Sequence, residues 1–438
     1  MNKTFVSASN PMLAQLVERK QAGNPVRVGV IGAGDYGESL VCQLGQIPGM
    51  QASVVCDLNI EKAFEVYQMV GYDRADVASS DDRGAIADRV IARKPVVTTD
   101  LEQAVCAPVD VIVDCTGEPE VGCRVAAGAI AQGKHVVMVN VEADITAGVP
   151  LAQRAKNAGV VYTLADGDQP SLITELADWA RCLGFDIVSA GKGTKLYPLE
   201  KALRMLADRE HPTKSDVTYL DGSKTQIEMA STANACGLMV DVVGMHGPSL
   251  RTQEIPEQLR PQFAGGILNQ SGVIDFVNQV LPDGKMIQQD AMTGVFVVGT
   301  CNALKGMETM ARKGVVMSAD RRHALLYRPF HLVGVETPWS ILKAVLDGVP
   351  TACPGETQRV DVVAVAKKNL KEGMVLGGLG MDDVRGVAMT MAQASGLLPV
   401  GLAAGATLMT SVSAGEYLTV DQVKQPAGSL AWQLRMGP

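Results

Sequence analysis

VRVGVIGAGDYG, residues 26–37, joins a short run of β-branched residues to the pattern Gly32-x-Gly34-x-x-Gly37. Gly32 allows a tight strand-to-helix turn, Gly34 lets the backbone approach a pyrophosphate, and Gly37 lets the next helix pack close to the strand. A helix is expected over 37–44, and its amino terminus offers unpaired N–H groups to phosphates. The stretch therefore predicts a dinucleotide-binding turn; a tight turn in another α/β domain is the alternative.

Asp57 follows Gly37 by 20 residues and ends the next expected strand, 52–56. A carboxylate at this position accepts hydrogen bonds from a ribose 2′-hydroxyl and repels a 2′-phosphate, which favours NAD. The nearest cation is Lys62, and a helix-capping role for Asp57 is the alternative. Asp35 and Tyr36 lie within the glycine turn and are counted with the cofactor-binding residues.

The composition bounds the protein class. The chain has 438 residues, 47% of them apolar, and a formal net charge of −8. This length predicts two or three domains, and the charge argues against nucleic acid or an anionic membrane as a partner. The sequence has no signal-peptide pattern and no apolar run of membrane-spanning length. The nine scattered cysteines, Cys42, Cys56, Cys115 and Cys123 among them, predict buried free thiols in a reducing cytoplasm.

The chain is expected to form an α/β protein of several parts. Residues 1–25 read as an arm that packs on the core or on a partner subunit. Residues 26–184 read as a Rossmann domain, to which the chain returns at 337–350. Residues 185–336 read as an α+β catalytic and dimerisation domain, and 355–438 as a small β-rich module with a tail.

Within the Rossmann domain, strands and helices alternate, which predicts a parallel sheet with helices on both faces. Strands are expected at 26–31, 52–56, 109–115, 135–140 and 160–164. Helices are expected at 60–70, 120–132 and 151–158. Residues 75–100, with a charged helix at 82–92, read as an insertion near the adenosine end. In the second domain, strands are expected at 187–190, 291–300 and 325–329, and helices at 198–209 and 223–238. A further helix is expected at 337–346, where the chain returns to the Rossmann domain.

Several turns follow strands of the predicted sheet, where ligands of open α/β sheets bind. Cys115, Thr116 and Gly117 form a candidate floor for the nicotinamide. Asn140 and Glu142 are candidates to position its ribose or carboxamide. For both turns, ordinary loop residues are the alternative.

Asp168 ends the next strand and points toward the hydride donor, unless it caps the helix that Pro170 begins. Lys192 and Lys195 flank a glycine loop that opens the second domain. An ammonium group there suits an anionic or carbonyl substrate and could polarise a carbonyl or transfer a proton. We take Lys192, Lys195 and Asp168 as candidate catalytic residues, against a solvated turn for the lysines.

A dense polar cluster at 318–328 contains three arginines, and its candidate site residues are Arg321, Arg322, His323 and Tyr327. Guanidinium groups grip phosphate or carboxylate, and histidine shuttles protons near neutral pH. We take the cluster as substrate-binding, against a solvated basic patch that faces another subunit.

Lys224, Glu228 and Ser231 fall near one face of the expected helix 223–238. A Lys–Glu pair on the surface is the favoured interpretation. A stripe that contacts the substrate, which makes Lys224 and Glu228 substrate-binding residues, is the alternative.

Taken together, these segments resemble the homoserine dehydrogenase-like group that carries a C-terminal SAF (antifreeze-like) domain. Within the group it resembles most the DXR-like (DRL) enzymes of Brucella and its relatives. The first part of the resemblance is carried by VGVIGAGDYG at 28–37, CDLNIEKA at 56–63, DCTGEPEVG at 114–122 and GKHVVMVNVEAD at 133–144. The second part is carried by ADGDQPS at 165–171, AGKGTKLYP at 190–198 and YRPFHLVGVETPWSI at 327–341. The SAF-like part is carried by KKNLKEGMVLGGLG at 367–380 and SAGEYLTVDQV at 413–423.

The resemblance implies an NADPH-dependent reductoisomerase. Such an enzyme converts 1-deoxy-D-xylulose 5-phosphate to 2-C-methyl-D-erythritol 4-phosphate, in isoprenoid precursor synthesis, as a cytoplasmic homodimer. Homoserine is not the expected substrate, because the aspartate–lysine helix pair of homoserine dehydrogenases is not recognisable. A divalent cation held partly by substrate would leave little trace, so metal use stays open.

Two alternatives to the reductoisomerase remain. One is an NAD(P)-dependent oxidoisomerase or dehydrogenase of a branched sugar acid. The other, from a different class, is a non-catalytic nucleotide-sensing protein, against which the cations Lys192 and Lys195 weigh.

Overall fold

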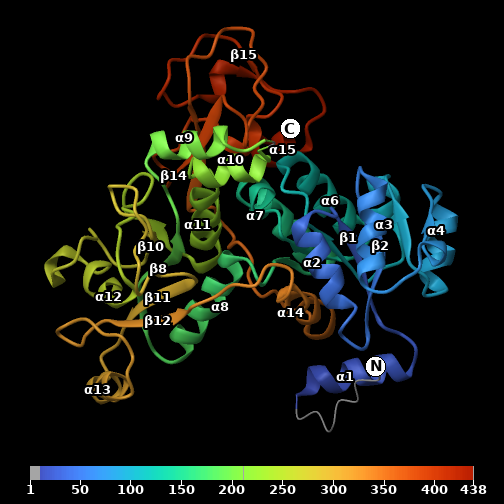
Figure 1. Cartoon of the computed structure of the whole chain (residues 1–438), viewed down its shortest axis with the longest axis horizontal. Helices are drawn as coiled ribbons and strands as arrows, with labels where there is room; N and C mark the ends of the chain where they lie inside the picture. The colour runs from blue at the N-terminus through green and yellow to red at the C-terminus, as the bar shows by residue number, and fades with distance from the viewer. Residues whose placement is uncertain (1–9, 211, 438) are drawn as a thin grey trace. The chain divides into compact units, whose positions relative to one another are not determined.

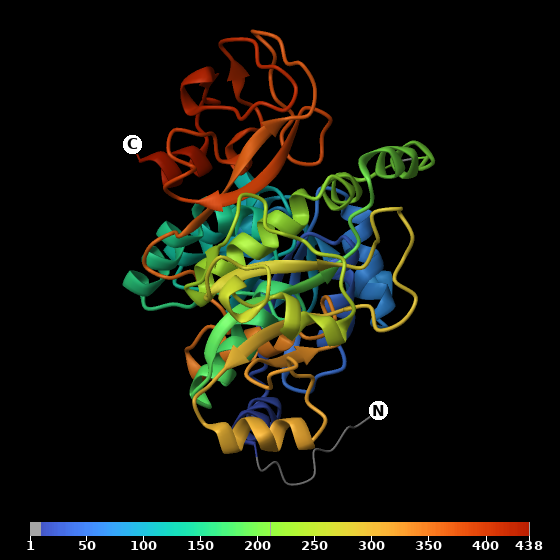
Figure 2. The same ribbon diagram turned by 90° about the vertical axis from the view of Figure 1, so that its left-hand side faces the viewer.

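The computed structural model describes residues 10–210 and 212–437, which fall into two compact units (Figures 1 and 2). The first unit runs to Asp168 and includes Leu332–Cys353. The second unit comprises Gln169–His331 and Pro354–Pro438. Residues 1–9 of the predicted N-terminal arm lie outside the described residues.

The first unit is built on a seven-stranded sheet with strand order β3-β4-β2-β1-β5-β6-β7. All of its strand pairs are parallel, which confirms the parallel α/β sheet predicted from the alternating rhythm. The strands are β1 (Val26–Ile31), β2 (Met50–Cys56), β3 (Ala78–Ser79), β4 (Val96–Thr98), β5 (Val111–Asp114), β6 (His135–Met138) and β7 (Tyr162–Leu164).

Helices of the first unit form two groups of neighbours. One group is α2 (Asp35–Leu44), α3 (Ile60–Met69) and α14 (Thr337–Leu342), of which α14 continues as a π-helical turn, Lys343–Asp347. The other group is α4 (Arg83–Ile91), α5 (Leu101–Cys106), α6 (Pro119–Ala131) and α7 (Val141–Ala158). The arm forms α1 (Pro11–Gln21), whose buried Met12 and Leu16 belong to the core of this unit.

Residues 75–100 are not an insertion, contrary to our expectation. They contribute β3 and β4 to the main sheet, where β4 pairs with β2, and α4 is the crossover between them. The two strands are only two and three residues long. Strands this short carry almost no alternation or β-branched enrichment, so the pattern does not reveal them. The adenosine end of the sheet is therefore two strands wider than predicted.

The later segment of the first unit, Leu332–Cys353, is hydrogen-bonded to the end of β7 and the residues after it. The Leu164 N–H donates to the Ala352 carbonyl at 2.8 Å, and the Asp166 N–H donates to the Ser340 hydroxyl at 2.8 Å. All nine cysteines are free. Cys56 and Cys123 are buried as predicted, whereas Cys42 and Cys115 are partly exposed.

The second unit contains a five-stranded mixed sheet with order β12-β11-β8-β10-β9. Its strands are β8 (Asp186–Thr194), β9 (Met239–Val240), β10 (Val273–Asn278), β11 (Val295–Thr300) and β12 (Ala324–Arg328). The predicted glycine loop after residue 190 is wrong, because β8 continues through it to Thr194. The glycines fit a strand here: a Cβ on Gly191 would lie 1.7 Å from the Asp275 carbonyl oxygen, so β8 and β10 could not approach.

Helices α8 (Gln169–Cys182) and α11 (Ser223–Cys236) contact each other and one face of this sheet. The further helices are α9 (Leu199–Ala207), α10 (Lys214–Leu220), α12 (Ile255–Gln258) and α13 (Leu304–Arg312). We expected α11 to be amphipathic with a polar surface, but nearly all of its side chains are buried. Its polar residues serve internal contacts instead: Asn234 donates to the Val360 carbonyl at 3.0 Å, and Gln226 accepts from Ala388 at 2.9 Å.

The C-terminal part of the second unit packs on α11. It contains an antiparallel pair, β13 (Val360–Ala366) and β14 (Val384–Thr390), and a smaller pair, β15 (Thr407–Leu408) and β16 (Val423–Lys424). Short 3-10 turns and α15 (Leu430–Met436) complete it. The strands and turns agree with a β-rich module, while the relation to the SAF domain stays a prediction.

Candidate functional site

The glycine turn after β1 has the geometry of a phosphate cradle. Gly32 has φ +98°, and a Cβ on Gly37 would lie 2.0 Å from the Gly32 carbonyl oxygen. Gly34 differs from both, because no heavy atom lies within 4 Å of where its Cβ would be. Gly34 is also the N-cap of α2, so no side chain at this position accepts a hydrogen bond from the first-turn N–H groups. These residues fit the pyrophosphate of a dinucleotide.

Asp57 faces this turn. Its Oδ2 accepts a hydrogen bond from the Ala33 N–H at 2.7 Å, and its Oδ1 accepts from the Asn59 N–H at 2.8 Å. Asn59, not Asp57, is the N-cap of α3. Each carboxylate oxygen accepts about two hydrogen bonds, so each retains capacity for a ribose hydroxyl. Asp57 therefore braces the glycine turn and still suits the predicted ribose contact.

Asp35 and Tyr36 diverge within the turn. Asp35 is exposed in the first turn of α2. The Tyr36 hydroxyl lies 2.7 Å from the Thr337 hydroxyl and donates to the Asp166 carbonyl at 3.2 Å. Burial, followed by the charge of Asp168, raises the Tyr36 pKa well above its usual value. The Tyr36 hydroxyl thus fastens α2 to β7 and α14, and we expect no cofactor contact from it.

The turn after β5 rests on a buried polar network. Asp114 accepts from the Thr116 N–H at 3.0 Å, from the Thr116 hydroxyl at 2.7 Å and from the Asn140 amide at 3.0 Å. Asn140 also donates to the Glu118 carbonyl at 3.0 Å and caps α7 by accepting from the Ala143 N–H at 2.9 Å. Burial raises the Asp114 pKa to about 6. Asn140 therefore stabilises the turn, and its side-chain amide is already hydrogen-bonded to protein groups.

The remaining candidates of the first unit lie around the same strand ends. Cys115 and Thr116 are partly exposed, and Gly117 is exposed with φ +70°. Glu142 is half-buried in the first turn of α7. Asp168 is buried after β7, and its charge acts on Tyr36. The sequence did not single out Thr337, whose hydroxyl also donates to the Asp166 carbonyl at 2.8 Å.

Lys192 and Glu228 form a buried ion pair in the second unit. The side chain of Lys192 is 5% exposed and that of Glu228 is 0% exposed. β8 directs Lys192 toward α11, which supplies Glu228, while Thr194 and Thr225 lie 3.2 Å apart between the same elements. Burial strengthens the attraction between the two charges, and removal of either partner would destabilise the protein. The expected Lys224–Glu228 pair forms at 3.9 Å, but it is not on the surface, because Glu228 is buried and its nearer partner is Lys192.

Lys195 and Ser231 do not join this pair. Lys195 is exposed just beyond the end of β8, and Ser231 is buried within α11. The sequence gives Lys192 and Lys195 the same candidate role. In the structure Lys192 is buried within β8, whereas Lys195 is exposed beyond the end of this strand.

The predicted arginine cluster lies at the other end of the sheet from Lys192. Lys192 pairs through Val295 with Arg328, whereas Ile187 pairs through Gly299 with Ala324. Arg321, Arg322 and His323 precede Ala324, and five strand residues from Ile187 to Lys192 span roughly 17 Å. Both arginines are exposed, and Arg321 has φ +55° in a turn. The structure therefore does not bring these arginines to Lys192.

His323 and Tyr327 also leave the predicted cluster. His323 is buried, its N–H donates to the Ser318 hydroxyl at 3.0 Å, and burial lowers its pKa. Tyr327 pairs with Phe296, so it lies on the opposite face of the sheet from Lys192. Arg328, the third arginine of the 318–328 segment and not one of the candidate site residues, shares the row of Lys192. Nothing local distinguishes it from Arg321; only strand register does.

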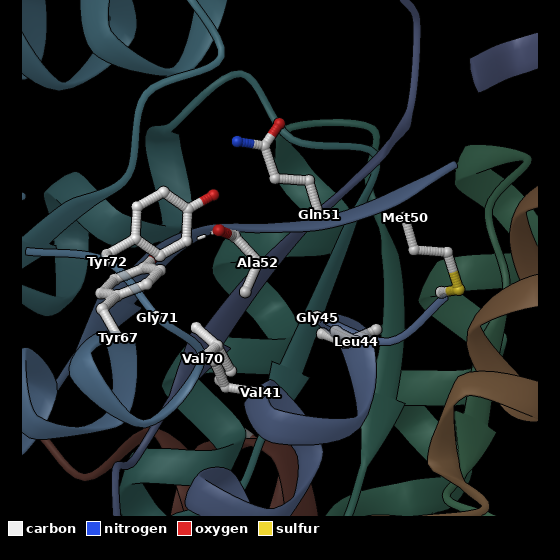
Figure 3. Close-up of a pocket in the computed structure, with 10 residues that line it drawn as sticks. All are labelled: Val41, Leu44, Gly45, Met50, Gln51, Ala52, Tyr67, Val70, Gly71 and Tyr72. Atoms are coloured by element: carbon white, nitrogen blue, oxygen red, sulfur yellow. Dashed lines mark hydrogen bonds between the residues drawn. The ribbon is translucent and has the colours of Figure 1, made fainter. Parts of the chain in front are cut away.

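A cavity of about 240 Å³ lies elsewhere in the first unit (Figure 3). Its lining comes from α2, β2, α3 and the turn after α3, and includes Gln51, Tyr67 and Tyr72. The Tyr67 hydroxyl donates to the Ala52 carbonyl at 3.1 Å. Met50 and Ala52 begin β2, so the cavity is at the opposite end of this strand from Asp57. It is therefore not the dinucleotide site.

Residues 10–210 and 212–437 lack two features. No group of three or more His, Cys, Asp or Glu side chains is placed to hold a metal ion. No helix in this part of the chain is long and apolar enough to cross a membrane.

Two protein families match successive parts of the chain. Residues 44–164 match the NAD binding domain of homoserine dehydrogenase. Residues 167–337 match the catalytic domain of oxidoreductase DRL. The chain matches none of the curated protein sequences.

Solved structures with a similar fold have low identity. They include a protein described as a probable dehydrogenase from Thermotoga maritima, 15% identical over 75% of this chain and 91% of that chain, with a TM-score of 0.41. Levoglucosan dehydrogenase, in complex with NADH and levoglucosan, is 14% identical over 74% and 91%, with a TM-score of 0.40. A 1-deoxy-D-xylulose 5-phosphate reductoisomerase from Zymomonas mobilis, in complex with NADPH, is 15% identical over 48% and 57%, with a TM-score of 0.36.

The glycine turn and the two family matches agree. A match to an NAD binding domain is followed by a match to the catalytic domain of an oxidoreductase, which supports an enzyme over a non-catalytic nucleotide sensor. The chain is an NAD(P)-dependent oxidoreductase.

Proposed function

We propose that the chain is a reductoisomerase of the DRL type that converts 1-deoxy-D-xylulose 5-phosphate to 2-C-methyl-D-erythritol 4-phosphate. The match of residues 167–337 to the DRL catalytic domain supports this proposal. The buried pair of Lys192 and Glu228 within the matched region is the observation that carries it. It provides a fixed ammonium group of the kind that carbonyl chemistry requires.

Lys192 is proposed as the group that binds the substrate carbonyl oxygen. When bound, a reduced nicotinamide supplies hydride to the aldehyde formed by rearrangement of the ketose carbon skeleton. In this reduction the C=O π electrons would move to oxygen, and a proton from the Lys192 ammonium would neutralise that oxygen. The amine then regains a proton from solvent. Glu228 acts as a positioning residue, because its carboxylate holds the ammonium in place.

The substrate phosphate needs a cation on the face of the sheet that Lys192 occupies. Arg328 lies in the same cross-strand row, two strands from Lys192, or roughly 10 Å away. Its guanidinium is 4.9 Å from the ring centre of Phe330. We propose Arg328 for this role instead of Arg321 and Arg322. A guanidinium binds a phosphate through two parallel hydrogen bonds.

The test follows cofactor absorbance at 340 nm with 1-deoxy-D-xylulose 5-phosphate and NADH or NADPH, with and without Mg²⁺ or Mn²⁺. Substrate-dependent oxidation is expected in the wild type and not in Lys192→Met. Lys195→Ala is the matched control, because this lysine is exposed three residues away. Absence of cofactor oxidation with both NADH and NADPH, whether or not Mg²⁺ or Mn²⁺ is added, would refute the proposed substrate.

A branched sugar acid is the second candidate substrate, for an oxidoisomerase or dehydrogenase reaction. The position of Arg321 and Arg322 favours it, because the predicted pair of phosphate-binding arginines is far from Lys192. Arg328 would then bind the substrate carboxylate. Reduction of NAD or NADP in the presence of branched sugar acids, without activity on the ketose phosphate, would favour this candidate.

We also propose a homodimer. The proposal is supported by β12, an edge strand of the second sheet, with Tyr327 44% exposed and Phe330 48% exposed beside it. Exposed edge strands with apolar side chains readily pair with another copy. Sedimentation velocity at micromolar concentration should give a dimer mass; a monomer at all concentrations would contradict it.

A further inference from the structure

Three carboxylates lie at the adenosine end of the first sheet, where β2 and β4 finish side by side. Cys56 at the end of β2 pairs with Thr98 at the end of β4. Asp57 follows Cys56, and Asp100 follows Thr98 by two residues. Asp81 comes from the segment after β3, the next strand of the sheet. Two of the three were not singled out from the sequence.

Hydrogen bonds tie these three residues to Thr98 and Thr99, while the Asp100 carboxylate itself caps α5 and accepts from the Glu102 N–H at 2.9 Å. The Asp57 N–H donates to the Thr98 carbonyl at 3.3 Å. Asp81 accepts from the Thr98 hydroxyl at 2.5 Å and from the Thr99 N–H at 3.0 Å. The Asp100 N–H donates to the Thr98 hydroxyl at 3.1 Å. The three acids are therefore fixed by strand ends and cannot move apart freely.

The titration of their neighbours agrees with this clustering. Burial, then the charges of Asp57, Asp100 and Asp81, raises the pKa of the Cys56 thiol to about 12. The hydrogen bond from Thr98 lowers the pKa of Asp81. All three carboxylates thus act on one thiol, and Asp81 stays ionised at neutral pH.

No ion pair between these three acids and a basic side chain is present among the described residues. Arg74 is paired with Glu61 at 2.7 Å, and Lys62 and Arg83 are exposed on the surface. Leu58, directly after Asp57, is 93% exposed. A side chain at this position is well placed to contact the adenosine, and here it is apolar.

We infer that Asp57, Asp81 and Asp100 together select NADH over NADPH, so the enzyme is NAD-dependent. This inference rests on the nicotinamide dinucleotide binding at the glycine turn. The 2′- and 3′-hydroxyls of NADH can donate to the free lone pairs of Asp57. A 2′-phosphate would bring a charge of about −2 to the same place, with no hydrogen to donate. A movement of the Asp57 side chain alone could relieve its own repulsion of the 2′-phosphate. The charges of Asp81 and Asp100 would still repel this phosphate after such a movement.

The test measures dissociation constants of NADH and NADPH by cofactor fluorescence on the full-length protein, without substrate. NADH should bind at least about tenfold more tightly than NADPH. Raising the NaCl concentration should narrow this ratio, because salt screens charge repulsion. Asp57→Ser with Leu58→Arg should reverse the preference, and Asp81→Asn alone should reduce it. Asp88→Asn, an exposed acid later in α4, is the control and should leave the ratio unchanged.

Equal or tighter binding of NADPH by the wild type would overturn the inference. Binding of neither cofactor would overturn it together with the dinucleotide site. A protein that prefers NADH yet fails to convert 1-deoxy-D-xylulose 5-phosphate would contradict only the proposed substrate. The binding measurement therefore separates the cofactor inference from the proposed function.

Discussion

Two glycine-rich segments, Gly32–Gly37 in the first unit and Gly191–Thr194 in the second, differ in what their glycines do. In the first, the chain leaves the sheet, and Gly34 leaves open space for a ligand. In the second, the chain stays in β8, and a Cβ on Gly193 would lie 1.8 Å from the Met292 carbonyl oxygen. One segment exposes backbone N–H groups, while the other buries a lysine. Glycine marks close approach in both, but only the neighbouring strands determine whether a ligand or protein approaches.

The largest effect should come from the buried lysine. Lys192→Met should lower kcat by about a thousandfold, because the reacting oxygen loses its charged partner. The same change leaves Glu228 buried without its closest partner, which typically costs about 3–5 kcal/mol of stability. Lys192→Met combined with Glu228→Gln should recover most of that stability but not the activity. Recovery of turnover in the double variant would remove Lys192 from the mechanism.

Two alanine substitutions test whether the two glycine segments differ in function as the structure indicates. Gly193→Ala should destabilise the second unit by about 3 kcal/mol or more, because the methyl group meets a backbone carbonyl. Gly34→Ala should leave the unfolding temperature nearly unchanged and weaken cofactor binding by about tenfold or more, since its methyl group enters the cradle. Thermal unfolding and cofactor titration of both variants measure the two effects. The opposite assignment of effects would mean that the two segments have exchanged roles.

The Asp114 network predicts a pH dependence in the first unit. The pKa of Asp114 is about 6 in the folded chain, against 3.8 for the unconstrained group. Between these values the folded state binds more protons than the unfolded state, so stability falls as pH rises. The loss amounts to roughly 2–3 kcal/mol and is complete above about pH 6.

Asp114→Asn isolates this contribution from the other titrating groups. The difference in unfolding free energy between wild type and variant should shift against the wild type from pH 4 to pH 7. Urea denaturation at several pH values measures it. A constant difference across this range would show that Asp114 ionises in the folded state as readily as in water.

The smallest effect concerns the two kinds of arginine. Arg328→Ala should raise KM for the phosphorylated substrate by about tenfold, or about 1.4 kcal/mol, while Arg321→Ala should leave it unchanged. Arg321 is the matched control because it is exposed at the far end of the same sheet. Steady-state kinetics of the two variants decides between them, and a larger effect in Arg321→Ala would return the phosphate site to the predicted cluster.

Prediction succeeded where the signal is contained in neighbouring residues. The β1 boundaries, the turn at Gly32 and the position of Asp57 follow from a β-branched run, spaced glycines and one acid. It failed for β3 and β4, which are too short for a periodic pattern. It also did not reveal the network around Asn140, because the sequence indicates a polar residue after a strand but not that four protein groups hydrogen-bond to its side chain.

The amino-acid sequence by itself determined the strand–turn–helix that binds a dinucleotide, because each glycine requirement there is met within 12 residues. Only the tertiary structure decided which charges act together. Lys192 meets Glu228 across 36 residues of chain, Arg328 rather than Arg321 shares its row, and Asp81 and Asp100 join Asp57. The physical reason is that charges interact through space. Strand order and register, which depend on packing of distant segments, set those distances.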